Sequence, residues 1–143
     1  MPAYHAVHLD EIPEPERERN KGEPDWKPLR IFFGIQSFGT NAYVGRQAGD
    51  ELVEEHTEID DSETKHEELY FVASGRARFT IEGDDVDAPA GTFVYIRDPS
   101  VKRSARAEED KTALLAFGGT PGERFAVSPW ERKWEPKVAR VEG

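Results

Sequence analysis

The stretch that decides the fold reads His66-Glu67-Glu68-Leu69-Tyr70-Phe71-Val72-Ala73-Ser74-Gly75-Arg76-Ala77-Arg78-Phe79-Thr80-Ile81. An apolar run over residues 69–73 and an alternating run over residues 77–81 predict two β-strands. Ser74 and Gly75 separate the two runs, and glycine readily adopts the positive φ that a tight turn requires. The pattern therefore favours a β-hairpin.

The first of these strands carries polar and apolar residues on one face. Side chains two positions apart point to the same side of a strand, so His66 and Glu68 should share a face with Tyr70 and Val72. A histidine and a carboxylate at the start of an otherwise apolar face indicate either a functional site or the solvated rim of a sheet.

The length and charge of the chain narrow its class. A chain of 143 residues fits one domain, and a net charge of −10 disfavours nucleic acids and anionic membranes as partners. The absence of cysteine excludes disulfides and thiolate chemistry. The first residues lack the pattern of a signal peptide, and no apolar run has a membrane-spanning length. We expect a soluble, cytoplasmic protein.

The composition changes at residue 29. Residues 1–28 are rich in charge and proline, which predicts an irregular N-terminal arm. The apolar residues that would anchor this arm are Val7, Leu9, Ile12 and Trp26. Residues 29–35 are short, apolar and β-rich, and they predict a strand buried on both sides where the core begins.

Short strands with turn residues between them then follow at a spacing of about ten residues. We expect them at residues 41–46, 51–56, 86–88, 92–96, 101–107 and 112–117, with a polar loop over residues 57–65. This pattern predicts an all-β, antiparallel sandwich or barrel over residues 29–118.

The C-terminal extension, residues 119–143, contains one helix signal. Ser128-Pro129-Trp130-Glu131 combines a capping serine, a proline at the first helical position and a glutamate three residues after the cap. We expect a short helix that carries Trp130 and Trp134 and ends at Pro136. The two tryptophans should pack against the barrel or a partner subunit.

Two spaced motifs resemble those of the cupin superfamily, in particular its small, single-domain, RmlC-like members. Glu68 precedes Gly75 by seven positions, Gly49 lies upstream, and His56-Thr57-Glu58 stands where the first cupin motif has two histidines one residue apart. A glutamate thus replaces the second histidine. His66 lies in a longer segment that follows, from which it could reach the vacant position.

The second cupin motif is degenerate. Gly91 begins it properly, after a corner formed by Pro89 and Ala90. Its proline, glycine, histidine and asparagine are replaced in turn by Arg97, Pro99, Lys102 and Arg106. The resemblance covers about residues 29–118 and implies a cupin-type double-stranded β-helix, also called a jelly-roll barrel, but it implies little about activity because cupin barrels host many functions.

The resemblance places a candidate metal site in the barrel. It implies that His56, His66 and Glu68 hold a divalent ion, Fe, Mn, Ni or Zn, with Glu58 as a further ligand. The structural alternative is that His56 ends a strand and His66 lies in a solvated loop.

Lys102 opposes a metal, because its ammonium group would lie where a fourth ligand belongs. This suggests an alternative in which the ammonium group of Lys102 pairs with Glu68 and replaces the metal ion. If the alignment to the motif is shifted by one residue, Arg103 takes the position of Lys102. Tyr70 and Tyr95 would wall the cavity with Phe79 and Phe93. Otherwise the arginines of residues 97–106 form a salt-linked surface edge with the acidic residues 108–110.

Three classes of function remain. The protein is a metal-dependent cupin enzyme with catalytic residues that the sequence does not identify, a metal-free module that binds a small molecule, or a structural or interaction protein with an inert barrel. We also expect a homodimer, because a strand over residues 29–35 would otherwise lie exposed at the edge of a sheet.

Overall fold

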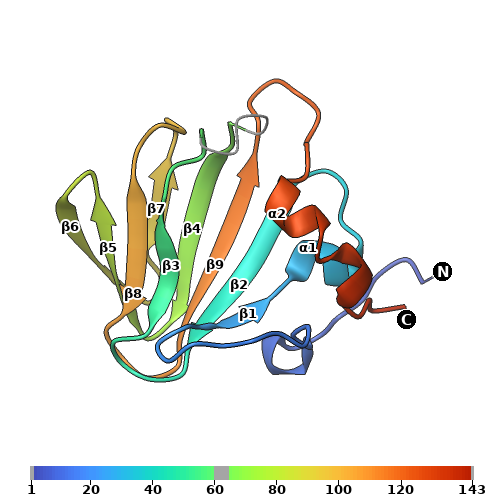
Figure 1. The fold of residues 1–143 in the computed structure, drawn as a ribbon, viewed down its shortest axis with the longest axis horizontal. Coiled ribbons are helices and arrows are strands. Elements are labelled where there is room, and N and C mark those ends of the chain that lie inside the picture. The colour runs from blue at the N-terminus through green and yellow to red at the C-terminus, as the bar shows by residue number, and fades with distance from the viewer. Residues whose placement is uncertain (1, 60–64, 143) are drawn as a thin grey trace.

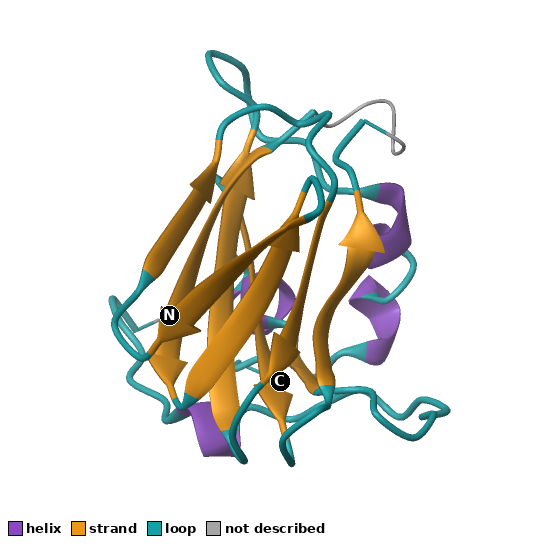
Figure 2. Ribbon diagram, turned by 90° about the vertical axis from the view of Figure 1, so that its left-hand side faces the viewer, coloured by secondary structure: helices purple, strands orange, loops and turns teal. Residues whose placement is uncertain are grey.

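The structure is a computed structural model that describes residues 2–59 and 65–142. In these residues two antiparallel sheets pack face to face, and short helices flank one side (Figures 1 and 2). The strands are β1 (Asp25–Lys27), β2 (Gly39–Gly45), β3 (Glu51–His56), β4 (Glu67–Ser74), β5 (Arg76–Ile81), β6 (Asp84–Pro89), β7 (Phe93–Ile96), β8 (Arg103–Ala107) and β9 (Thr112–Gly119). The helices are α1 (Leu29–Phe33) and α2 (Pro129–Arg132), with the 3₁₀ turns η1 (Leu9–Glu11) and η2 (Glu135–Lys137).

The two sheets enclose the hydrophobic core. The larger sheet has the strand order β1-β2-β9-β4-β7, and the smaller one has the order β3-β8-β5-β6. Alternate residues of each strand point inward, as a pleated strand requires. The larger buried side chains of this core are those of Leu52, Val53, Tyr70, Val72, Phe79, Val94, Ile96 and Leu114.

The predicted hairpin is wrong, although both of its strands and its turn are present. β4 pairs with β7 and β9 in the larger sheet, whereas β5 pairs with β6 and β8 in the smaller one. The chain crosses between the sheets at Gly75, whose φ is 73° and which lies against Thr112 of β9. A turn signal shows where a chain changes direction but not which strand becomes its partner.

The strand predicted over residues 29–35 is also wrong, because this segment forms α1. The helix starts after Pro28, whose carbonyl accepts a hydrogen bond of 2.9 Å from the amide of Phe32. It ends at Gly34, which adopts the left-handed conformation of a C-cap. A short apolar run fits a buried helical turn as well as a strand, and α1 packs against β2. The segment therefore forms no exposed sheet edge, and the argument for a homodimer from that edge fails.

The arm contributes one strand and several anchors to the fold. Its last residues form β1, which pairs with β2. Ile12 and Trp26 are buried, while Val7 and Leu9 are only partly covered. The loop predicted over residues 57–65 lies partly outside the described residues. The arm thus extends the larger sheet by a strand instead of forming only an irregular cap.

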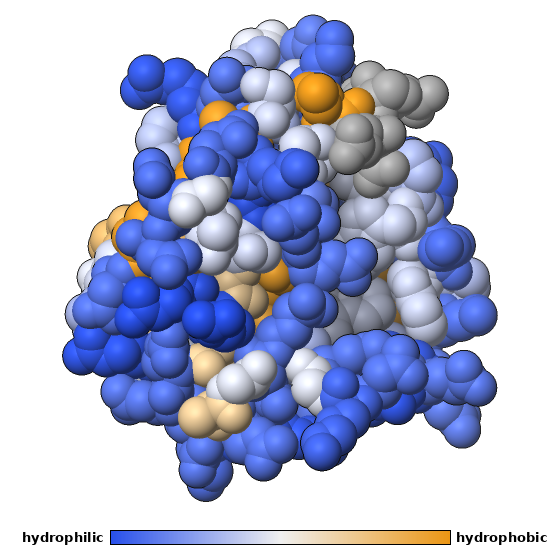
Figure 3. Space-filling model, turned by 60° about the vertical axis from the view of Figure 1, so that its left-hand side comes forward, coloured by the Kyte–Doolittle hydropathy of each residue, from blue (hydrophilic) through white to orange (hydrophobic). Residues whose placement is uncertain are grey.

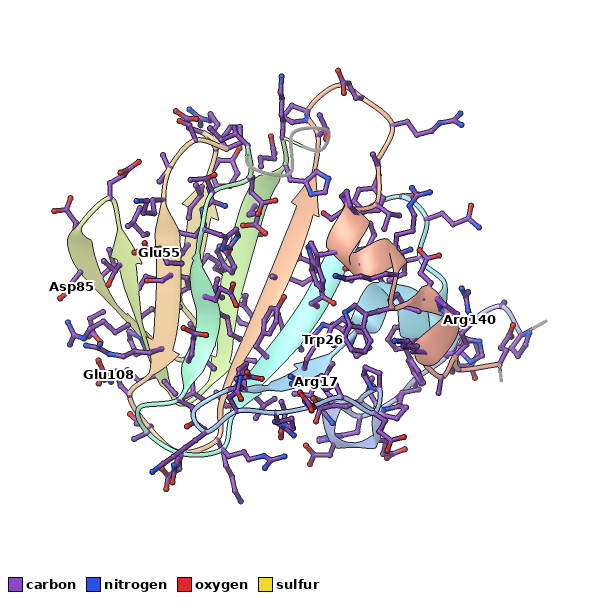
Figure 4. The ribbon with its side chains drawn as sticks, viewed as in Figure 1. Arg17, Trp26, Glu55, Asp85, Glu108 and Arg140 are labelled. Atoms are coloured by element: carbon purple, nitrogen blue, oxygen red, sulfur yellow. The ribbon has the colours of Figure 1, made fainter. Side chains whose placement is uncertain are left out.

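The C-terminal segment lies beside β1 and β2, next to Trp26 of β1 (Figures 1 and 4). The ring of Trp26 lies 5.7 Å from that of Trp130 and 5.6 Å from that of Trp134. α2 is shorter than expected, since Trp134 follows it and Pro136 lies within η2. Ser128 forms no side-chain cap.

The surface carries the excess charge of the chain. The face shown in Figure 3 is mostly hydrophilic, and hydrophobic residues appear only in small areas between hydrophilic ones. Over residues 2–59 and 65–142, no helix combines the length and the apolar character needed to cross a membrane.

The crossing at Gly75 provides a test of the fold. A Cβ atom at this position would lie 2.4 Å from the Thr112 hydroxyl oxygen and 2.8 Å from its Cα. Gly75→Ala should therefore lose about 2–4 kcal/mol of unfolding free energy, through backbone strain together with steric overlap. Gly83 also has a positive φ but has no atom within 4 Å of an added Cβ. Gly83→Ala should lose only about 1–2 kcal/mol. Urea denaturation measures both losses, and equal losses would contradict the close packing at Gly75.

Candidate functional site

Glu68 lies at the centre of the polar groups inside the sandwich. It shares the inner face of β4 with Tyr70 and Val72, as the alternation predicts. Its Oε1 accepts a hydrogen bond of 2.5 Å from the hydroxyl of Tyr70 and one of 2.6 Å from Nη1 of Arg103. The carboxylate is therefore held by two donors, one from each sheet.

Arg103 is the counter-charge of Glu68. It lies on β8 with its side chain fully buried, and its Nε donates to the carbonyl of Val101 at 2.8 Å. The side chain of Lys102 is exposed instead, so the expected pair between Lys102 and Glu68 does not form. The register shifted by one residue is the one that the structure adopts. Arg103 is also buried in the sandwich, not part of a salt-linked surface edge.

The pattern of β8 contains a signal for this arrangement. Arg103, Ala105 and Ala107 occupy alternate positions, so they lie on the same face of the strand, and all three are buried. Small alanines at alternate positions indicate the inward face of a strand. The alternation of side chains along the strand would therefore have placed Arg103 inside and Lys102 outside.

His56 approaches the same carboxylate from β3. Its Nδ1 lies 2.8 Å from the carbonyl oxygen of Glu54, which can only accept, so Nδ1 carries the hydrogen. Its Nε2 faces inward, 2.8 Å from Oε2 of Glu58 and 3.8 Å from Oε1 of Glu68. The inner nitrogen of His56 therefore points at two carboxylates.

His66 is held in a similar way. It precedes β4 and is buried, with 6% of its surface exposed. Its Nε2 donates to the carbonyl of Ala126 at 3.1 Å, and its Nδ1 lies 3.8 Å from Oε1 of Glu58. Its ring stacks on Phe125 with 5.3 Å between the ring centres. Neither contact with the C-terminal segment could be predicted from the sequence, because about 60 residues separate the partners.

The pKa values of this cluster reflect its opposite charges. Burial lowers the pKa of His56, but the hydrogen bond to Glu58 and the neighbouring Glu68 outweigh it and raise the pKa to about 10. Burial also opposes ionisation of Glu68, yet His56, the Tyr70 hydroxyl and Arg103 hold the pKa of this carboxyl below its ordinary value. Burial and Glu68 raise the pKa of Tyr70, so this hydroxyl stays a donor. Without a metal, two cations therefore balance Glu58 and Glu68.

A cavity of about 630 Å³ opens beside this cluster. Its wall comes from β2, β3, β4 and β9, from the arm and from the C-terminal segment. Lining residues outside the cluster include Arg17, Glu23, Trp26, Asn41, Tyr43, Glu51, Glu54, Phe125, Trp130, Glu131 and Trp134.

Tyr95 and Phe93 do not wall this cavity, contrary to the expectation. They are exposed on the outer face of β7, because Val94 and Ile96 take the inward positions. Tyr70 lies in the core and also lines the cavity, whereas Phe79 lies in the core and does not line the cavity.

The imidazole and carboxylate groups of the cluster are suitable ligands for a divalent metal ion. One ligand atom from each of His56, Glu58 and Glu68 lies within 4.8 Å of the others. A metal-binding histidine normally donates its outer N–H to a carbonyl or carboxylate, as both His56 and His66 do here. Arg103 and Tyr70 bond to Oε1 of Glu68, and no described residue bonds to its Oε2. Nitrogen and carboxylate ligands of this kind suit Zn, Fe, Mn or Ni.

Comparison with known proteins identifies the fold. No protein-family model matches the sequence, and no curated protein is significantly similar to it in sequence. A solved structure of a predicted oxalate decarboxylase from Thermotoga maritima matches with a TM-score of 0.62 and 21% identity, over 81% of this chain and 99% of that chain. A putative sugar phosphate isomerase from Acidithiobacillus ferrooxidans matches with a TM-score of 0.60 and 21% identity, over 80% and 74% of the two chains. An RmlC-like cupin protein from Desulfovibrio desulfuricans matches with a TM-score of 0.60 and 17% identity, over 81% and 96%.

These matches confirm the cupin resemblance at the level of the fold. The chain is a small cupin-type jelly roll with a short C-terminal helix. At identities of 17–21%, the similarity does not extend to what the neighbours act on.

Two neighbouring cations, Lys102 before β8 and Arg103 at its first position, provide a matched test of the site. Arg103→Met removes the fully buried guanidinium that pairs with the largely covered carboxylate of Glu68 and should lower the unfolding free energy by about 3–5 kcal/mol. Lys102→Met removes an exposed charge and should change it by less than about 0.5 kcal/mol. Urea denaturation at pH 7 measures both, and a greater loss for Lys102→Met would contradict the register described here.

The raised pKa of His56 predicts how stability depends on pH. The unfolded histidine titrates near its ordinary pKa of 6.5, and the folded one at about 10. Between these values the folded state binds the extra proton, so the stability that His56 contributes falls as the pH rises. Thermal unfolding with a chelator should show the melting temperature decreasing from pH 6.5 to 10. His56→Gln should flatten this slope, and an unchanged slope would rule out His56 as its source.

Proposed function

We propose that this protein binds a small molecule in the cavity at a divalent metal ion held by His56, Glu58 and Glu68, with His66 as the fourth ligand. The observation that carries the proposal is the convergence of ligand atoms from His56, Glu58 and Glu68. Nδ1 of His66 lies 3.8 Å from Glu58, and each imidazole is oriented by a backbone carbonyl. Zn, Fe, Mn and Ni are all compatible with these ligands.

The residues around the ligands have distinct roles in this proposal. Arg103 and Tyr70 fix the rotamer of Glu68 through its Oε1 and leave Oε2 for the ion. The carbonyl of Glu54 holds the tautomer of His56 in which Nε2 can coordinate. A bound ion would supply Lewis acidity toward an oxygen atom of the ligand.

A metal-free site is the second candidate. Protonated His56 and Arg103 already balance the charges of Glu58 and Glu68, and Arg103 takes the part that we expected of Lys102. The cavity would then bind its ligand without an ion. Metal binding at neutral pH must displace the proton of His56, so the affinity for the ion should increase with pH.

The charges of the lining favour a neutral or cationic ligand. Among the described residues that line the cavity, six are glutamates, and Arg17 is the only arginine or lysine. Burial and the neighbouring Glu54 and Glu23 raise the pKa of Glu51, which indicates a negative potential at the rim. Trp130 adds an aromatic surface, on which a ring or an organic cation can pack.

Metal content tests the first candidate. Protein purified without an affinity tag should hold about one equivalent of Zn, Fe, Mn or Ni, measured by elemental analysis. His56→Ala and Glu58→Gln should lose it, while His8→Ala, in the exposed part of the arm, should keep it. In calorimetric titrations with Zn²⁺, the affinity should rise between about pH 6 and pH 8.

Three results would count against this. If the wild-type protein takes up no ion after incubation with each metal, the metal-free candidate stands instead. Equal loss of metal in His8→Ala would show binding outside the cluster. An affinity for Zn²⁺ that is independent of pH would contradict the displacement of a proton from His56.

The tryptophans provide a probe of ligand charge, since all three residues of this type line the cavity. We expect small sugars and amines to change the intrinsic tryptophan fluorescence at lower concentration than dicarboxylates or sugar phosphates of the same size. Glu51→Gln combined with Glu54→Gln should reduce this preference by removing two charges from the rim. Tighter binding of the anions to the metal-free protein would contradict the proposed ligand class.

A further inference from the structure

The C-terminal segment comprises residues 120–142. Its far end, residues 129–142, is held by buried polar contacts. Glu131 accepts hydrogen bonds from Arg30 of α1 and, at 3.1 Å, from Asn41 of β2. Arg30 also donates to Glu135 at 2.7 Å. These side chains replace the capping box that the sequence suggested, because Glu131 turns to the sandwich and not to Ser128. The far end is therefore held independently of the metal ligands.

The near end of the segment, residues 120–128, contacts the sandwich through Phe125 and Ala126. Residues 120–128 form no helix or strand, and they approach the larger sheet through Phe125 and Ala126. The ring of Phe125 lies 3.2 Å from where a Cβ of Gly39 would be, so this glycine makes room for it. The missing side chain of Gly39 on β2 thus leaves space for the ring of Phe125.

The near end of the segment orients the imidazole ring of His66. The carbonyl of Ala126 accepts the hydrogen of Nε2, and the ring of Phe125 covers one face of the imidazole. Both contacts leave Nδ1 directed toward Glu58 at 3.8 Å. Without them, the imidazole of His66 would keep only its longer polar contact with Glu58 among the described residues.

We infer that Phe125 and Ala126 are positioning residues of the metal site, so that metal binding and the docking of residues 120–128 stabilise each other. The inference rests on the proposed function. A group that orients a metal-bound histidine typically changes metal affinity by about 10–100-fold. By linkage, an ion that is bound more tightly when the segment is docked must favour docking by the same factor.

Hydrogen exchange of the full chain tests the linkage. The probe is Zn²⁺ alone, added to protein stripped with a chelator. Amides of residues 120–128 should exchange several-fold more slowly with Zn²⁺, whereas residues 129–142 should change little because Arg30 and Asn41 already hold them. In His66→Gln, Zn²⁺ should still bind through the other ligands but should no longer slow exchange in residues 120–128.

A pair of phenylalanine variants tests the positioning role. Phe125→Ala should lower the affinity for Zn²⁺ about tenfold, because His66 loses its stacking partner. Phe93→Ala, in an exposed residue of β7, should leave the affinity unchanged. Combining Phe125→Ala with His66→Gln should add little to the loss in His66→Gln alone.

The outcomes separate this inference from the proposed function. If Zn²⁺ binds to the wild-type protein and His56→Ala abolishes binding, while exchange in residues 120–128 and the affinity of Phe125→Ala do not change, the metal site stands and the coupling is overturned. If the wild-type protein binds no Zn²⁺, the proposed function fails, and the inference fails with it.

Discussion

The carboxylate of Glu68, largely covered between two β-sheets, is the constraint on which the rest of this structure depends. An ionised Glu68 in the interior would be strongly destabilising without partners. Tyr70 supplies a hydrogen bond from the same strand, and Arg103 supplies a charge from the opposite sheet. Because the partners come from both sheets, the two layers must close on each other in one register for the charge to be satisfied.

The polar cluster and the cavity depend on each other. The core between the sheets is filled with apolar side chains, whereas beside Glu68 the wall comes from the arm and from the C-terminal segment. A second polar network, in which Arg30 and Asn41 hold Glu131, keeps that segment in place. The cavity is thus bounded by two charged clusters, one with the proposed metal ligands and one that fastens its outer wall.

Local pattern predicted most strands well, and the resemblance to the cupin motifs predicted the central pair of the site, His56 and Glu68. Turn residues and apolar runs located most strands within a few residues, and His56 and Glu68 meet across the sandwich with 3.8 Å between their polar atoms. The pairing of β4 and β5 was beyond reach because strand partners are non-local. The strand prediction for the segment that forms α1 failed for a different reason. A short apolar run has no periodicity that distinguishes a helix from a strand.

The errors in the site follow from the same limits. Every residue of β7 is apolar or aromatic, so alternation could not show that Tyr95 points outward. Lys102 and Arg103 differ by a single position, and a slip of one residue in a strand exchanges its inner and outer faces. The contacts of His66 with Phe125 and Ala126 join distant parts of the chain and left no trace in composition or spacing.

The most direct test of the metal site is the anomalous diffraction of a crystal grown with Zn²⁺ and measured at the zinc edge. We expect one strong peak inside the sandwich, about 2.0–2.2 Å from Nε2 of His56 and from oxygen atoms of Glu58 and Glu68, with Arg103 still bonded to Glu68. A cluster without a peak, in which Nε2 of His56 remains hydrogen-bonded to Glu58, would contradict the metal site and leave a cavity whose charges are balanced by protein groups alone.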